Sequence, residues 1–130
     1  QAHNCAALAE HPCDLLVSVN YAFLVPLYML RVARCAALNL HRGKLPEYAG
    51  AYPIMRAIEA GERDIVLTTH LMEDQYDTGA VVLETLHPVN YEPANSIEDN
   101  VARVKTELIP LYPVALAAAI ELLQSQSITK

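Results

Sequence analysis

The chain has 130 residues, which suits one domain built around one hydrophobic core. Its 53% hydrophobic and 18% charged residues argue against an intrinsically disordered chain, which would carry fewer apolar side chains and more charge. Nine Lys and Arg against 15 Asp and Glu give a net charge of −6, so the chain lacks the excess of cations that neutralises nucleic acid phosphates. We therefore expect a single domain over residues 1–130 and no nucleic acid partner.

The longest apolar stretch, residues 15–30, contains Ser18, Asn20 and Pro26. It is shorter than the roughly 20 apolar residues that span a bilayer, so we interpret it as core and expect no membrane partner. No basic signal peptide opens the chain, and its three cysteines cannot all pair within it. We therefore expect reduced thiols and a cytoplasmic location. Because the chain begins with Gln1, we expect a trimmed product or an excised piece.

Short apolar runs predict four strands, and apolar residues at helical spacing predict helices between them. The strands are expected over residues 15–19, 36–41, 65–72 and 80–86. The helices among them are expected over residues 27–32 and 53–60, and residues 1–10 are also compatible with a helix. The first strand has no polar alternation, which is typical of a strand covered on both faces of a parallel sheet. The alternation of strands and helices predicts an α/β domain with a mostly parallel sheet flanked by helices.

The last third of the chain is predicted to be helical. Ser96 precedes acidic residues in the pattern of an N-cap, and apolar residues follow it at helical spacing as far as Leu108. Pro110 and Pro113 are expected to end this helix, before a second one over residues 114–124.

Two polar residues stand at the carboxyl end of the second predicted strand. Asn39 and His41 are two residues apart, so their side chains project from the same face of the sheet. In open α/β sheets, ligands bind at the carboxyl ends of the strands. From the spacing alone, a turn cap and an ordinary surface histidine are the preferred interpretation of these two residues.

Two ordered motifs give the chain a family resemblance. Residues 39–50 read Asn-Leu-His-Arg-Gly-Lys-Leu-Pro-Glu-Tyr-Ala-Gly, and residues 69–79 read Thr-His-Leu-Met-Glu-Asp-Gln-Tyr-Asp-Thr-Gly. The first resembles the Asn-x-His…Leu-Pro-x-x-x-Gly signature of formyltransferases that use 10-formyltetrahydrofolate, and the second resembles the family's Thr-x-His…Asp-Thr/Ala-Gly segment. The resemblance runs from about Asp14 to Glu84. It implies a partial Rossmann-like formyltransferase fold that lacks the family's amino-terminal part.

By that resemblance, the catalytic residues are Asn39, His41 and Asp77. The chemistry requires such groups, because negative charge develops on the formyl oxygen and a proton must leave the attacking amine. Asn39 and His41 can stabilise that oxygen, and Asp77 can favour the charged form of His41 and receive or relay the proton. The ordinary role of an aspartate at this position is in a glycine-containing turn.

The resemblance also implies 10-formyltetrahydrofolate as the co-substrate. The folate-binding residues it implies are Tyr21, Ala22, Phe23, Leu24, Asp74 and Asp77. The substrate-binding or supporting residues it implies are His70, Tyr48 and Gly50. From the residues alone, 20–26 can equally be a packed connection between a strand and a helix, and His70 a structural histidine.

The sequence offers no convincing metal ligand set. His3 and Cys5, and likewise His11 and Cys13, lie two residues apart, and side chains at that spacing diverge on a helix. We therefore expect no metal.

The expected activity is transfer of a formyl group from 10-formyltetrahydrofolate to a primary amine. A nucleotide-linked amino sugar is the preferred acceptor, and glycinamide ribonucleotide is its close competitor. The alternative is a non-catalytic folate-binding or assembly module derived from a formyltransferase. The resemblance implies that the apolar strand Leu15–Val19 lacks the neighbour that the family's amino-terminal part supplies. This predicts a homo-oligomer or a partner chain covering that edge.

Overall fold

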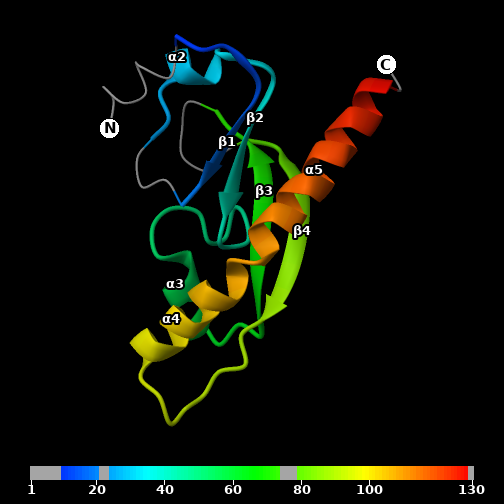
Figure 1. Cartoon of the computed structure of the whole chain (residues 1–130). Coiled ribbons are helices and arrows are strands. Elements are labelled where there is room, and N and C mark those ends of the chain that lie inside the picture. The colour runs from blue at the N-terminus through cyan, green and yellow to red at the C-terminus, as the bar shows by residue number, and fades with distance from the viewer. Residues whose placement is uncertain (1–9, 21–23, 74–78, 129–130) are drawn as a thin grey trace.

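The computed structural model describes residues 10–20, 24–73 and 79–128 (Figure 1). Within these residues the strands are β1 (Cys13–Val19), β2 (Ala33–His41), β3 (Asp64–Leu71) and β4 (Val81–Pro88). The helices are α2 (Leu27–Leu30), α3 (Pro53–Glu59), α4 (Ile97–Leu108) and α5 (Leu111–Ile128). The predicted strands and the first three of these helices are confirmed, with ends shifted by a few residues. The helix-compatible stretch 1–10 lies, apart from its last residue, outside the described residues.

The sheet is mixed, so the prediction of a mostly parallel sheet was wrong. Its strand order is β1-β2-β3-β4; β1 and β2 are parallel, whereas β2 pairs antiparallel with β3, and β3 with β4. A parallel pair needs a crossover connection of a dozen or more residues. The connection from β3 to β4 is shorter than that, and the connection from β2 to β3 contains only the short helix α3, which does not return the chain to the other end of the sheet. The α/β class, with helices flanking the sheet, is confirmed.

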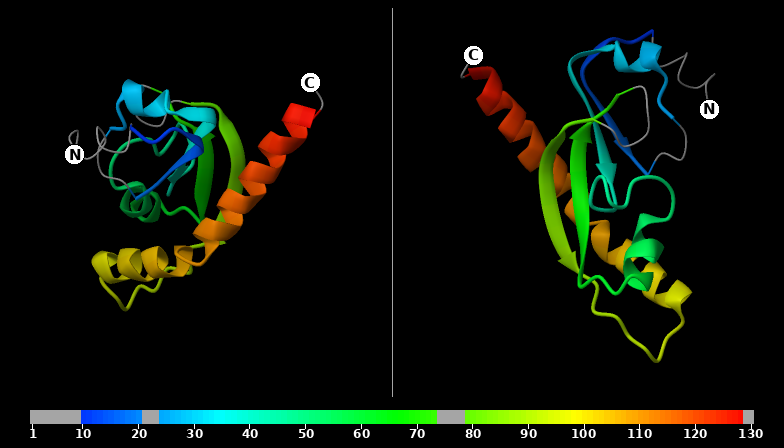
Figure 2. Two further views of the ribbon diagram at one scale, coloured as in Figure 1. Left: turned by 45° about the horizontal axis from the view of Figure 1, so that its top comes forward. Right: turned by 180° about the vertical axis from the view of Figure 1, so that it is seen from behind.

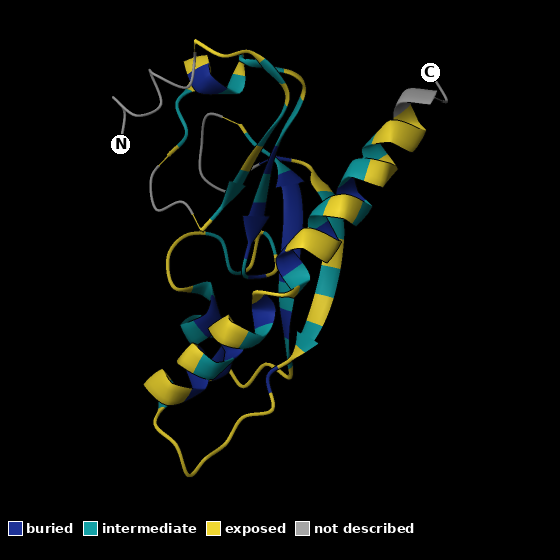
Figure 3. Cartoon of the chain, in the orientation of Figure 1, coloured by how far each residue is buried: buried dark blue, intermediate teal, exposed yellow. Residues whose placement is uncertain are grey.

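The two faces of the sheet differ in chemistry because side chains alternate along each strand. On one face, Asn39 pairs with His70 across the β2–β3 ladder, and His41 pairs with Thr68. The other face carries apolar residues of the core, such as Leu67 of β3, which has no exposed surface. Helix α5 packs against β3 and β4, and β3 is buried over most of its length (Figure 3).

The first strand is less covered than its sequence predicted. β1 is an edge strand in the described sheet, and the side chain of Val17 is 41% exposed. The expectation of a strand covered on both faces was therefore wrong for this chain. Its parallel pairing with β2 is as predicted.

The two final helices follow the sequence prediction except at one proline. The hydroxyl of Ser96 accepts a hydrogen bond from the backbone N–H of Asp99 at 3.1 Å, which confirms the N-cap of α4. Pro113 was expected to end a helix but lies in the first turn of α5. A proline is tolerated there because the first backbone N–H groups of a helix have no acceptor within it. The C-terminal part of α5 projects beyond the sheet in each view (Figure 2).

A buried asparagine joins α4 to the loop before it. The side chain of Asn100 is 0% exposed, and its Oδ1 accepts hydrogen bonds from the backbone N–H of Glu92 at 2.9 Å and from Arg103 at 3.0 Å. Its Nδ2 donates to the carbonyl oxygens of Glu92 at 3.0 Å and Ser96 at 2.9 Å. All the hydrogen-bonding positions of the amide are used, so this one side chain fixes the loop to the helix.

Replacing Asn100 with alanine should lower the free energy of unfolding by about 2–3 kcal/mol, because a fully buried side chain and its hydrogen bonds to the backbone of Glu92 and Ser96 would be lost. Urea denaturation followed by circular dichroism measures this. Asn95, which is exposed in the same loop, is the matched control, and Asn95→Ala should change the stability by less than about 0.5 kcal/mol. Equal stability of the two variants would contradict the role of Asn100.

Cys13 and Cys35 are free thiols in the described part of the chain. Among the described residues, no single helix is long and apolar enough to cross a membrane; α4 and α5, which meet at a bend of 50°, satisfy the length and composition test only when taken together.

Candidate active site

The candidate site lies on the polar face of β2 and β3, close to the end of β2. Asn39 is half-buried, His41 is 8% exposed and His70 is 2% exposed. The strand period of two places Asn39 and His41 on one face, and the antiparallel register brings His70 opposite Asn39. The structure therefore brings together three of the residues singled out in the sequence.

Asn39 and His70 form a hydrogen bond whose direction the neighbouring backbone fixes. Nδ1 of His70 lies 2.9 Å from the carbonyl oxygen of Leu71, which can only accept, so this nitrogen carries a proton. Nε2 of His70 lies 3.1 Å from Nδ2 of Asn39 and, in the neutral ring, accepts a hydrogen bond from that amide. The carboxamide of Asn39 is thereby held in one orientation.

His41 is held by the loop that follows it. Its Nε2 lies 2.6 Å from the carbonyl oxygen of Tyr48, so this nitrogen donates. The loop is anchored at its start, where the hydroxyl of Thr68 donates to the carbonyl oxygen of Gly43 at 2.8 Å. A Cβ on Gly43 would lie 2.8 Å from the Cβ of Pro53 and 2.9 Å from that of Tyr48, so this close packing requires glycine.

The predicted supporting residues Tyr48 and Gly50 belong to this loop. Tyr48 contacts His41 through its backbone, while its ring packs against the hydrophobic core. The pKa of the Tyr48 phenol lies above its usual value, because partial burial disfavours the phenolate and the carboxylate of Glu62 opposes a second negative charge. Gly50 has a φ of +87°, a conformation that glycine adopts without strain. Its role in the structure is to shape the loop.

Arg56 was missed in the sequence. Its guanidinium donates to three backbone carbonyls of this loop, including that of Tyr48, and lies over the Tyr48 ring. No spacing rule predicts such a role, because the acceptors are backbone atoms whose positions depend on the fold.

Several predicted site residues fall outside the described part of the chain. These are Tyr21, Ala22, Phe23, Asp74 and Asp77. Leu24 is described and is 41% exposed. Among the residues that the structure does describe, there is no group of three or more His, Cys, Asp or Glu side chains that could hold a metal ion.

Gly79 connects the second motif to the site. Its Cα approaches β3 so closely that an added Cβ would overlap the carbonyl group of Leu71. The oxygen of that carbonyl is the acceptor for Nδ1 of His70. The glycine of the motif therefore packs against the backbone that orients the His70 ring.

This arrangement can stabilise negative charge that develops on a carbonyl oxygen. An amide and an imidazole stand side by side on one strand. Asn39 keeps one N–H that His70 does not accept, and His41, which donates to Tyr48 through Nε2, can donate a second hydrogen bond through Nδ1 when the ring is charged. Both are already held by neighbouring groups, so little conformational entropy would be lost when they engage a substrate.

Comparison with known proteins assigns the family. Residues 1–116 match the family model described as "Formyl transferase", so the chain belongs to the formyl transferase family. It is 37% identical over 107 residues to the methionyl-tRNA formyltransferase of Dichelobacter nodosus, a match that covers 82% of this chain and 34% of the relative. The chain thus spans about a third of the length of that curated relative.

Solved structures agree with this assignment. A phosphoribosylglycinamide formyltransferase from Streptococcus pneumoniae matches with a TM-score of 0.70 and 28% sequence identity, over 92% of this chain and 65% of that one. A sugar N-formyltransferase from a Shewanella species matches with a TM-score of 0.67, over 95% of this chain and 47% of that one. At 22% identity, the second match shows a likeness of fold alone.

Proposed function

We propose that this chain transfers a formyl group from 10-formyltetrahydrofolate to a primary amine. The observation that carries the proposal is the pair Asn39 and His41, side by side on β2, each held by a hydrogen bond to a fixed partner. Membership of the formyl transferase family supports the same reaction.

In the proposed reaction, the amine nitrogen attacks the formyl carbon. A new C–N bond forms, the bond from that carbon to N10 of the folate breaks, and the amine proton is transferred so that tetrahydrofolate leaves protonated. After the attack and before the bond to N10 breaks, Asn39 and His41 stabilise the negative charge on the formyl oxygen. Asp77 favours the charged form of His41 and receives or relays the proton.

The folate is proposed to bind to the segment after β1 and to the second motif, residues 69–79. The residues proposed for this are Tyr21, Ala22, Phe23, Leu24, Asp74 and Asp77. His70, Tyr48 and Gly50 are proposed to support the site from β3 and the loop after β2. No metal is needed, because Asn39 and His41 supply the donors that polarise the formyl group.

The proposed acceptor is a small amine, with a nucleotide-linked amino sugar as the first candidate and glycinamide ribonucleotide as its competitor. The net charge of −6 disfavours tRNA, whose phosphates attract basic proteins. A related protein is named for methionyl-tRNA, so methionyl-tRNA belongs among the acceptors tested.

The test incubates the chain with 10-formyltetrahydrofolate and each acceptor while the release of tetrahydrofolate is followed by absorbance. Formylation of one acceptor, dependent on His41, supports the proposal. Folate binding without turnover on any acceptor would favour the alternative, a non-catalytic module derived from a formyltransferase.

We also propose that the free edge of β1 is covered by a second copy of this chain or by a separate chain. In the described sheet β1 pairs only with β2, and Leu15–Val19 contains neither lysine nor proline to discourage further pairing. Light scattering during size-exclusion chromatography at micromolar concentration should show a mass above that of the monomer. Val17→Lys should reduce that mass, whereas Leu86→Lys on β4 should leave it unchanged. A monomer that melts cooperatively would contradict self-association.

A further inference from the structure

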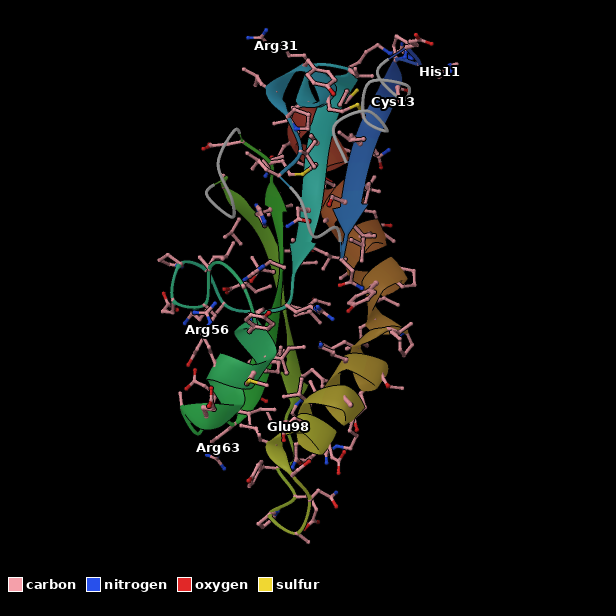
Figure 4. The ribbon with its side chains drawn as sticks, turned by 90° about the vertical axis from the view of Figure 1, so that its left-hand side faces the viewer. His11, Cys13, Arg31, Arg56, Arg63 and Glu98 are labelled. Carbon is pink, nitrogen blue, oxygen red and sulfur yellow. The ribbon has the colours of Figure 1, made fainter. Side chains whose placement is uncertain are left out.

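We propose that Arg56 is a positioning residue that fixes His41 for catalysis. Arg56 lies on α3, beside the loop that follows β2 (Figure 4). The side chains of Arg56 and His41 bind the same backbone carbonyl, that of Tyr48. The kinetic part of this inference rests on the proposed function.

The guanidinium of Arg56 donates hydrogen bonds to three carbonyl groups of the loop after β2. Its Nε donates to the carbonyl oxygen of Ala51 at 2.9 Å, and its Nη2 donates to those of Ala49 at 2.6 Å and Tyr48 at 3.2 Å. Its carbon lies 5.8 Å from the centre of the Tyr48 ring, within the range of a cation–π contact. These contacts hold the three carbonyl groups close to one another and fix the direction of the Tyr48 carbonyl.

The Tyr48 carbonyl is also the acceptor for His41. Nε2 of His41 lies 2.6 Å from the same oxygen that Arg56 binds. A carbonyl oxygen has two lone pairs, so it can accept both hydrogen bonds at once. Since His41 donates through Nε2, the position of this oxygen sets both the orientation of the ring and the nitrogen that carries the proton.

Lysine cannot replace Arg56 in this role. The planar guanidinium has several N–H donors in fixed directions, so it can bind several carbonyl groups at once. An ammonium group is a compact point charge and lacks that geometry. Arg56→Lys therefore keeps the charge but loses the geometry, which makes it the sharpest single variant.

The first test observes the imidazole itself and needs no activity. In ¹⁵N-labelled protein, the His41 signals are assigned by their loss in His41→Ala. In the unmodified chain, His41 should carry its proton on Nε2 and exchange it slowly with water. In Arg56→Lys, that signal should shift and its proton should exchange faster. An unchanged signal would overturn the proposal.

The second test measures kinetics. Arg56→Lys should lower kcat about 10- to 100-fold with little change in KM, because a displaced catalytic group affects the transition state more than binding. In a His41→Ala background, the same substitution should cost little more, because Arg56 would act through a group already removed. An equal loss in both backgrounds would overturn the proposal, since it would indicate a general structural effect.

Arg103→Lys is the matched control. Arg103 also donates from its guanidinium to backbone carbonyls, those of Val89 and Asn90, but it lies on α4 beside the loop that follows β4. This variant should leave both the His41 signal and kcat close to those of the unmodified chain. If the unmodified chain transfers no formyl group to any acceptor, the proposed function fails, and the imidazole measurement alone decides the role of Arg56.

Discussion

Replacing His41 with alanine should lower kcat/KM for formyl transfer about 100-fold or more, the usual loss when a general acid or base, or an oxyanion donor, is removed. The stability should fall by only about 1 kcal/mol, the usual net contribution of a hydrogen bond such as that from His41 to the Tyr48 carbonyl. Steady-state kinetics and urea denaturation of the same preparation separate the two effects. Asn39→Ala should behave in the same way, since its amide is the other donor on this strand.

His87 provides the matched control for that prediction. It lies on β4, where its Nε2 and the carboxylate of Glu107 are 2.8 Å apart. His87→Ala removes a partly buried imidazole from the same sheet and should leave kcat/KM nearly unchanged. A rate close to that of the unmodified chain in His41→Ala would exclude the proposed mechanism.

Replacing Gly79 with alanine should destabilise the fold by about 3 kcal/mol or more, at the upper end of the cost of overpacking. The added Cβ would overlap the Leu71 carbonyl group, and backbone cannot give way as the end of a side chain can. The connection between β3 and β4 would have to move away, and the acceptor of His70 would move with it. We therefore expect a lower melting temperature together with a loss of activity in the fraction that remains folded.

Gly61→Ala tests whether that effect is steric. Gly61 has a φ of +76°, but a Cβ there would meet no atom within 4 Å. This variant should cost about 1–2 kcal/mol, from backbone strain alone. If Gly79→Ala lowers the free energy of unfolding no more than Gly61→Ala does, the predicted steric overlap with the Leu71 carbonyl group is contradicted.

Local patterns predicted the elements of this fold better than their arrangement. The strands, the proline at the start of α3 and the Ser96 cap follow from residues within a few positions of each other. The direction of β3 depends on the path of the chain through α3, and the direction of β4 depends on the connection between β3 and β4. An apolar pattern carries no information on either. Pro113 was misread because a proline breaks a helix in its interior but not in its first turn.

The candidate site shows the same division. Asn39 and His41 were predicted from their spacing and from a family motif, and the register of β2 and β3 then placed His70 beside Asn39. Arg56 could not be predicted in this way, since it acts on backbone carbonyls that come together only after the loop has folded. Asp77 lies outside the described residues, so its catalytic role stays a prediction.

The packing of α5 on the sheet has a consequence for synthesis of the protein on the ribosome. The strands that carry the candidate site are synthesised before α5, whose side chains, among them Tyr112 and Ala115, cover the opposite face of β3. Until they leave the exit tunnel, the apolar face with Leu67 is open to water and to other nascent chains. Transiently exposed apolar surface of this kind promotes aggregation and recruits chaperones. A ribosome that stalls before α5 is complete would therefore hold a chain in which the polar face of β2 and β3 is already synthesised. The apolar face of the same sheet would still lack the helix that covers it.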